Sequence, residues 1–261
     1  MKKSLLNEFM SPYDSRDYIV ESINHPDQEY PDELDYRSEL PRAWNQGVDG
    51  PCSAYSAAAI KTWHELKDVN LTEDLSPYFV YHLRNNYPDS GMYPRDTMNI
   101  LKKYGIAKSK SFKKSKMKRL EDIPKEVLDE ASNYRIKGYA RVNTIDGLKK
   151  SLYINGPAYI AMPVFHGNHN FWKPGFKGKM LGGHALVVVG YNKEGFILRN
   201  SWGDSWADNG HSIYPYSDWG THWEIWTMVD DVSSEVKPVV KSKCDSDNLF
   251  ISLFKKIFKK K

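Results

Sequence analysis

Cys52, His184 and Asn200 are the residues whose types could together perform nucleophilic catalysis. A cysteine attacks as its thiolate, and a thiol near its ordinary pKa of about 8.5 is only slightly ionised at neutral pH. A histidine can take the thiol proton and return it later, while an asparagine oxygen can hold the second ring nitrogen and fix the tautomer. We therefore predict that Cys52 attacks, His184 carries the proton and Asn200 orients His184.

The same chemistry needs groups that stabilise the oxyanion and protect the site from water. Gln46 precedes Cys52 closely, and we predict that its side-chain amide and the backbone N–H of Cys52 are the oxyanion donors. Trp202 follows Asn200 in an Asn-Ser-Trp-Gly run, and we predict that its indole shields the hydrogen bond between Asn200 and His184. A lone cysteine at the start of an apolar helix is commonly just a small buried residue. The accompanying glutamine, histidine and asparagine favour a nucleophile.

Three separated motifs resemble the papain-like cysteine peptidases, and the similarity extends over most of residues 31–230. The motifs are Asn45-Gln46-Gly47-Val48-Asp49-Gly50-Pro51-Cys52, Gly182-Gly183-His184-Ala185 and Arg199-Asn200-Ser201-Trp202-Gly203. The resemblance implies an α+β fold, with a helical left lobe, an antiparallel β-sheet right lobe and an active-site cleft between them. It also implies that Gly91, Met92, Tyr93 and Ala185 bind substrate, in a pocket that would prefer an apolar side chain.

Departures from the family pattern indicate the branch. The family commonly reads Cys-Gly-Ser-Cys-Trp around the nucleophile, whereas Asp49, Pro51 and Ser53 stand at the first, third and fifth positions here. This wording is similar to that of the disulfide-poor bacterial and viral members, and Lys179–Ala185 resembles the cathepsin B branch. The proline also removes one backbone donor beside the thiol.

Local patterns predict the elements that would position these residues. An alanine-rich run without glycine or proline predicts a helix whose first turn carries Cys52. A second helix is predicted to begin at Ser76-Pro77, and a third to cover residues 96–104 before Gly105. Apolar runs predict strands over 158–164, 184–189, 196–200 and 223–228.

The chain divides into three predicted parts. Residues 1–30 are interpreted as a short prosegment that lies along the cleft and blocks substrate, and residues 31–235 as the papain-like catalytic domain. Residues 236–261 form a basic tail. Within its last part, residues 249–261, apolar residues recur every four positions beside five lysines, as in an amphipathic helix. The net charge of +4 is due to this tail. Two alternatives remain open for residues 249–261: packing back on the enzyme, or peripheral membrane or protein contact.

Composition limits the other function classes. The basic run 108–119 has no accompanying nucleic-acid-binding signature, so we predict a solvated loop and no nucleic-acid partner. His166 and His169 lack a nearby third ligand, so no metal or other cofactor is predicted. Cys52 and Cys244 are the only cysteines, which precludes a disulfide framework if the first is the nucleophile.

The predicted location is cytoplasmic or another reducing compartment, or virion-associated if the chain is viral. The apolar run near Met1 is too short for a signal peptide, and no stretch approaches the length of a membrane span.

The sequence predicts a cysteine endopeptidase that forms a thioester acyl-enzyme with a peptide or protein substrate and is made as a short zymogen. Two alternatives are a catalytically silent papain-fold protein that binds peptides or assists assembly, and a cysteine acyltransferase. The complete Cys-His-Asn set argues against the first, while Pro51 and Ser53 keep it open. The Asn-Ser-Trp-Gly motif is a poor match for a cysteine acyltransferase.

Overall fold

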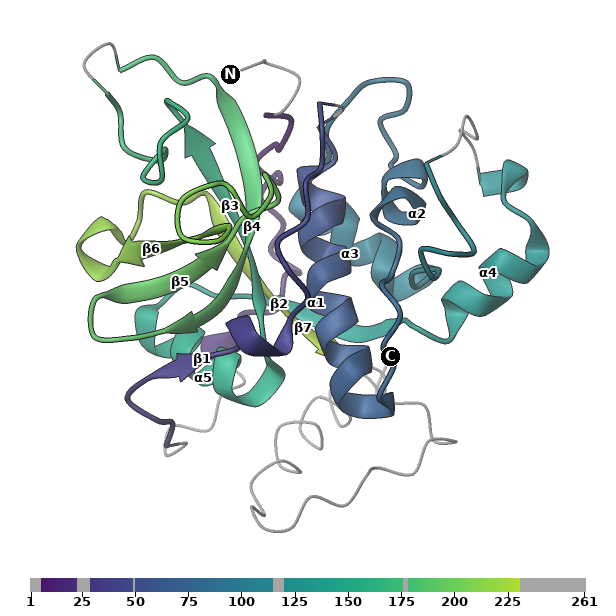
Figure 1. Ribbon diagram of the computed structural model, residues 1–261, viewed down its shortest axis with the longest axis horizontal. Helices are drawn as coiled ribbons and strands as arrows, with labels where there is room; N and C mark the ends of the chain where they lie inside the picture. Colours follow the sequence, from purple (N-terminus) through teal and green to yellow (C-terminus); the bar gives the residue numbers. More distant parts are fainter. Residues whose placement is uncertain (1–5, 23–28, 49, 115–119, 176–177, 231–261) are drawn as a thin grey trace.

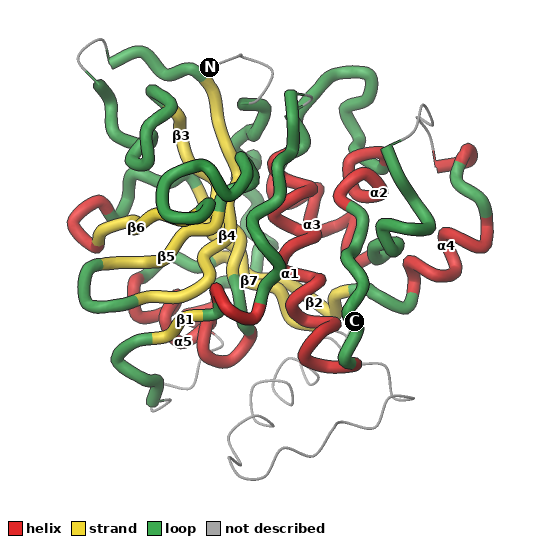
Figure 2. The backbone as a smooth tube through the Cα atoms, viewed as in Figure 1, coloured by secondary structure: helices red, strands yellow, loops and turns green. Residues whose placement is uncertain are grey.

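The computed structural model describes residues 6–22, 29–48, 50–114, 120–175 and 178–230. Within these ranges the chain forms a helical lobe and an antiparallel sheet that lie side by side (Figure 1; Figure 2). This agrees with the predicted α+β class. The predicted tail over 236–261 lies outside the described residues, as does Cys244.

The long helix α1 (Cys52–Val69) lies between the two lobes and carries Cys52 as its first residue. Most side chains of its first three turns are buried, and small alanines there let it pack closely against the sheet. The helix ends at Asn70, which adopts the left-handed conformation with φ of 55°. The predicted helix and the place of the cysteine in its first turn are confirmed.

Three shorter helices complete the helical lobe: α2 (Pro77–His82), α3 (Pro94–Lys103) and α4 (Lys125–Ser132). The Ser76 hydroxyl caps α2 by accepting a hydrogen bond from the Phe79 N–H at 3.3 Å. Helix α3 begins two residues before its predicted start, because Pro94 occupies the first helical position, where its fixed φ is favourable. Helix α4 was not predicted.

The described strands form one seven-stranded sheet in the order β2-β7-β3-β4-β5-β6, with β1 paired to β4 and every pairing antiparallel. The strands are β1 (Leu34–Asp35), β2 (Ile136–Arg141), β3 (Ala158–Val164), β4 (Gly182–Tyr191), β5 (Gly195–Arg199), β6 (His211–Pro215) and β7 (Glu224–Asp230). All four predicted strands are confirmed. The sequence patterns missed β1, β2, β6 and helix α5 (Ile145–Asn155), whose apolar runs are short or interrupted by polar residues and glycine.

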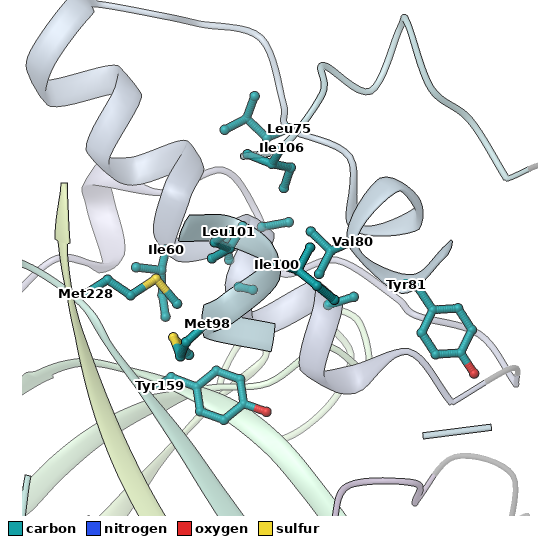
Figure 3. Close-up of a cluster of buried hydrophobic side chains, with 14 of the residues drawn as sticks. Ile60, Leu75, Val80, Tyr81, Met98, Ile100, Leu101, Ile106, Tyr159 and Met228 are labelled. Atoms are coloured by element: carbon teal, nitrogen blue, oxygen red, sulfur yellow. The ribbon is translucent and has the colours of Figure 1, made fainter. Parts of the chain in front are cut away.

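The sheet has a buried core on each face. One core joins it to α1, α2 and α3, and Figure 3 shows Ile60, Met98, Tyr159 and Met228 close together at this junction. The other core lies between the strands and α5, and includes Leu148, Ile160 and Val188. Because α1 and β4 pack against each other, the start of the helix and the start of the strand are held near one another. No helix in the described ranges is long and apolar enough to span a bilayer.

Candidate functional site

The Cys52 thiol lies at the N-terminal end of α1, where the helix dipole favours negative charge. The side chain is nevertheless fully buried, and its Sγ donates a hydrogen bond to Oε2 of Glu8 at 3.7 Å. Burial raises the pKa of Cys52 well above its ordinary value. In this arrangement the sulfur is a neutral thiol.

His184 lies on β4 and is held by Asn200, which follows β5. The Nε2 of His184 is 2.7 Å from Oδ1 of Asn200. An amide oxygen can only accept, so Nε2 carries the proton and Nδ1 is the basic nitrogen. Within the described ranges, Nδ1 has no hydrogen-bond partner. Burial lowers the pKa of His184 to about 4, so the ring is neutral.

The thiolate and imidazolium that the predicted proton transfer would form are therefore not the form of the site described here. The thiol donates to Glu8, and no hydrogen bond within the described ranges joins it to His184. The physical reason is burial: covering both groups removes the water that would stabilise their charged forms. The N-terminal segment contributes to this covering through Glu8, which lies against the thiol, while Phe171 and Trp202 lie against the His184 ring.

The indole of Trp202 stacks on the imidazole of His184, with ring centroids 4.5 Å apart and an angle of 24° between the planes. Phe171 lies against both rings. The indole thus covers one face of His184.

Gln46 is buried in a loop joined to the segment that carries Asn200. Its N–H donates to the Ser201 carbonyl at 2.9 Å, and the Ser201 hydroxyl donates to its Oε1. These bonds fix the carboxamide, and an amide whose oxygen is occupied presents its N–H groups in the opposite direction. Sequence reasoning missed Ser201, although it belongs to the same Asn-Ser-Trp-Gly run.

The predicted substrate-binding residues lie on both sides of the N-terminal segment. The carbonyl of Asn7 accepts from the Met92 N–H at 3.1 Å, the Phe9 N–H donates to the Met92 carbonyl at 3.0 Å, and the Glu8 N–H donates to the Gly183 carbonyl at 3.2 Å. The segment therefore pairs with the backbone of both lobes, and Figure 1 shows it passing between them.

Close approach of this segment depends on glycine. A Cβ at Gly91, whose φ is +95°, would lie 2.2 Å from the Asn7 carbonyl oxygen, and one at Gly183 would lie 2.3 Å from that of Glu8. The ring of Tyr93 packs against Phe9 with centroids 5.2 Å apart. Ala185 is buried, and its backbone N–H points to the Cys52 sulfur.

Two acidic side chains anchor the segment beyond the thiol. Asp17 accepts hydrogen bonds from Arg95 at 2.6 and 2.9 Å and from Arg141 at 2.8 Å. Glu21 accepts from the N–H groups of Asn143 and Thr144 at the start of α5. The sequence shows that residues 1–30 are acidic, but nothing local in it identifies the partners of Glu8 or Asp17.

Two other sequence features are the histidine pair His166 and His169 and the basic run 108–119. Within the described part of the chain, no cluster of three or more His, Cys, Asp or Glu residues could hold a metal ion. His166 lies in the turn after β3, where its Nδ1 accepts from the Asn168 N–H at 3.2 Å. Lys108 and Lys110 pair with Glu73, and residues 115–119 of the basic run lie outside the described ranges.

Residues 30–223 match the family model described as papain family cysteine protease. The chain is 29% identical over 205 residues to the uncharacterized peptidase C1-like protein L477 of Acanthamoeba polyphaga mimivirus, covering 68% of this chain and 66% of that protein. It is 25% identical over 207 residues to papain of Carica papaya, covering 73% and 56%. The chain thus spans just under two thirds of the first relative and less of the second.

Solved structures show the same fold. Xylellain, a cysteine protease from Xylella fastidiosa, superposes with a TM-score of 0.75 at 23% identity, covering 88% of this chain and 97% of that one. ProCathepsin B S9 from Trypanosoma congolense superposes with a TM-score of 0.70 at 16% identity, covering 88% and 87%. These similarities show that the chain shares its overall fold with both structures.

Proposed function

Because the chain belongs to the papain family of cysteine proteases, we propose that it is a cysteine endopeptidase that acts through a thioester acyl-enzyme on Cys52. The observation that carries this proposal is the hydrogen bond between His184 and Asn200, which leaves the basic nitrogen of His184 available for a thiol proton. The start of α1 supplies a favourable place for the resulting thiolate.

The proposed reaction has two halves. In the first, the Cys52 proton moves to Nδ1 of His184 and the sulfur attacks the peptide carbonyl carbon, with the oxyanion held by Gln46 and the Cys52 N–H. The intermediate collapses to a thioester, and His184 returns the proton to the departing amine. In the second half, His184 takes a proton from water, which attacks the thioester and releases the acid, and the proton then returns from His184 to the Cys52 sulfur. Asn200 keeps the ring in one tautomer throughout.

We also propose that the protein is made as a short zymogen in which residues 6–22 block the site. Three features support this: the fully buried thiol, the Glu8 carboxyl beside it, and backbone pairing of the segment with Met92 and Gly183. Substrate would need the same backbone groups, so the segment and a peptide would compete for them. Departure of the segment would expose Cys52 and His184 and remove the burial that keeps both neutral.

Hydrolysis of a peptide mixture with and without an added primary amine tests the catalytic proposal. Mass spectrometry is expected to find acid products in both cases, because water resolves the thioester. Predominant amide formation with the amine would favour the acyltransferase alternative. Binding of peptides without any product would favour the silent papain-fold alternative.

Replacing Asp17 by alanine is expected to loosen the segment, because Arg95 and Arg141 lose the carboxylate that they share. Alkylation of Cys52, measured in a Cys244→Ser background, is expected to become about tenfold faster, since charge-assisted hydrogen bonds contribute about 1.5–3 kcal/mol each. Asp14→Ala is the matched control, because Asp14 pairs with Arg16 inside the segment itself. Equal rates for Asp17→Ala and the control would mean that the two arginines do not hold the segment in place.

A further inference from the structure

The Glu8 side chain fills a buried pocket directly beneath the thiol. Only 2% of the residue is exposed, and its Oε1 lies 2.5 Å from the hydroxyl of Tyr159 on β3. The ring of this tyrosine packs within the hydrophobic core that joins the two lobes (Figure 3). The pocket therefore has a rigid floor with a polar group at its end.

The Tyr159 hydroxyl is the first of three in a buried chain. It lies 2.7 Å from the Ser53 hydroxyl, which lies 2.6 Å from the hydroxyl of Thr97. Thr97 is in turn 3.3 Å from the Tyr93 carbonyl oxygen. All three hydroxyl-bearing residues are at least 98% buried. The chain is possible because the Ser53 hydroxyl lies between those of Tyr159 and Thr97.

A chain of hydroxyls can be polarised in either direction, since each hydroxyl donates once and can accept as well. Suppose that the side chain in the pocket donates a hydrogen bond to the Tyr159 hydroxyl. Tyr159 then donates to Ser53, Ser53 to Thr97, and Thr97 to the Tyr93 carbonyl. If the side chain in the pocket instead accepts from Tyr159, the two hydrogen bonds among the three hydroxyls reverse their direction. The pocket can thus satisfy a side chain that presents a donor, an acceptor or both.

The charges around the pocket favour an uncharged occupant. No lysine or arginine in the described ranges forms an ion pair with Glu8, whereas the carboxylate of Glu224 on β7 lies nearby and is itself bound by Arg141 at 3.1 Å. Burial, with Glu224 adding repulsion, raises the pKa of Glu8 well above its ordinary value. Without a cation beside it, a carboxyl in this pocket is favoured in its neutral form, and a glutamine carboxamide has the same shape.

We infer that the pocket formed by Tyr159, Ser53 and Thr97 is a specificity pocket of the active site, and that it selects substrates carrying a glutamine or protonated glutamate side chain. This inference rests on the proposed peptidase function. It replaces the apolar preference expected from the resemblance, because an apolar side chain would leave the Tyr159 hydroxyl without one of its partners. A site built to hydrogen-bond its substrate discriminates strongly against analogues that lack the polar group.

The first test needs no catalysis and uses the full chain in a Cys244→Ser background. Cys52 alkylation rates at neutral pH are compared for Glu8→Gln and Glu8→Met, which have similar size but differ in hydrogen bonding, each with Tyr159 intact or replaced by phenylalanine. We expect Glu8→Gln to protect the thiol at least as well as Glu8 does, and Glu8→Met to label about tenfold faster. Tyr159→Phe should speed labelling of Glu8→Gln but not of Glu8→Met.

Comparing the four proteins removes any general effect of Tyr159→Phe on folding, and Ser53→Ala provides an independent second variant that is expected to act in the same direction. Equal labelling of the glutamine and methionine variants would overturn the inference. An equal change in labelling rate on adding Tyr159→Phe to the glutamine and methionine variants would also overturn it.

The second test measures kcat/KM for peptides with glutamine, methionine or leucine at each of the two positions preceding the scissile bond. The glutamine peptide is expected to be cleaved about tenfold better at one position, and Tyr159→Phe is expected to abolish that advantage. A methionine peptide cleaved as well as the glutamine peptide overturns the substrate assignment. If no peptide is cleaved while the labelling differences hold, the proposed hydrolysis fails and the pocket stands.

Discussion

Replacement of Cys52 by serine is expected to lower kcat/KM for peptide hydrolysis by about 10⁴-fold or more. A serine hydroxyl in this position keeps a similar size but has a far higher pKa than a thiol, so neutral His184 cannot generate an effective nucleophile from it. Removing the nucleophile of a catalytic set costs nearly as much as removing the whole set. The measurement is the rate of fluorogenic peptide cleavage, together with mass spectrometry of the N-terminal segment over time.

Cys244→Ser is the matched control for this prediction, because it makes the same chemical change at the other cysteine of the chain. It should retain wild-type hydrolysis and release of the segment. Undiminished cleavage by Cys52→Ser, or loss of cleavage in Cys244→Ser, would contradict the assignment of Cys52. An intact N-terminal segment in a fully active wild-type protein would instead contradict the zymogen proposal alone.

Replacement of Lys61 by methionine is expected to reduce the free energy of unfolding by about 3–5 kcal/mol. Lys61 lies on α1 with its side chain fully buried, and it forms ion pairs with Glu65 of the same helix and with Asp230 at the end of β7. The carboxyl of Asp68 lies close to Asp230, and burial and the charge of Asp230 raise the pKa of Asp68 to about 7. Methionine would fill the space but leave buried carboxylates without their cation.

Urea unfolding followed by fluorescence, extrapolated to water, measures this loss. The control is Lys125→Met, which breaks a pair of the same i to i+4 spacing with Asp129 on α4, where both side chains are mostly exposed. Exposed pairs of this kind contribute about 0.2–1 kcal/mol, so the control should unfold close to wild type. An equal decrease in the free energy of unfolding for the two variants would show that burial does not strengthen the ion pairs of Lys61.

Much of the fold follows from local patterns. The alanine-rich run after Pro51 indicates helix α1, Ser76-Pro77 marks the start of α2, and Gly105 follows the end of α3. Each of these signals depends on interactions within a few residues. Four strands were recognisable as continuous apolar runs because they are buried in the sheet. The elements that were missed, such as β2 and β6, have fewer apolar residues and owe their strand conformation to neighbours distant in the sequence.

The residues of the candidate site could be predicted from the sequence, but their neighbours in space could not. Cys52, His184, Asn200, Gln46 and Trp202 were predicted because their types and local wording carry chemistry that few other residues could perform. Their neighbours in space could not be predicted, because nothing near Glu8 in the chain indicates that it lies 3.7 Å from the thiol, or that Tyr159 would be its partner.

By itself, then, the order of residues determined the family, the proposed reacting groups and most of the elements that carry them, since these depend on residue type and on short-range periodicity. Only the tertiary structure decided the state of the site: which groups are neutral, what covers the thiol and what the pocket beneath it contains. Burial and hydrogen bonding between distant segments set those properties, and both arise only after the two lobes and the N-terminal segment have packed together.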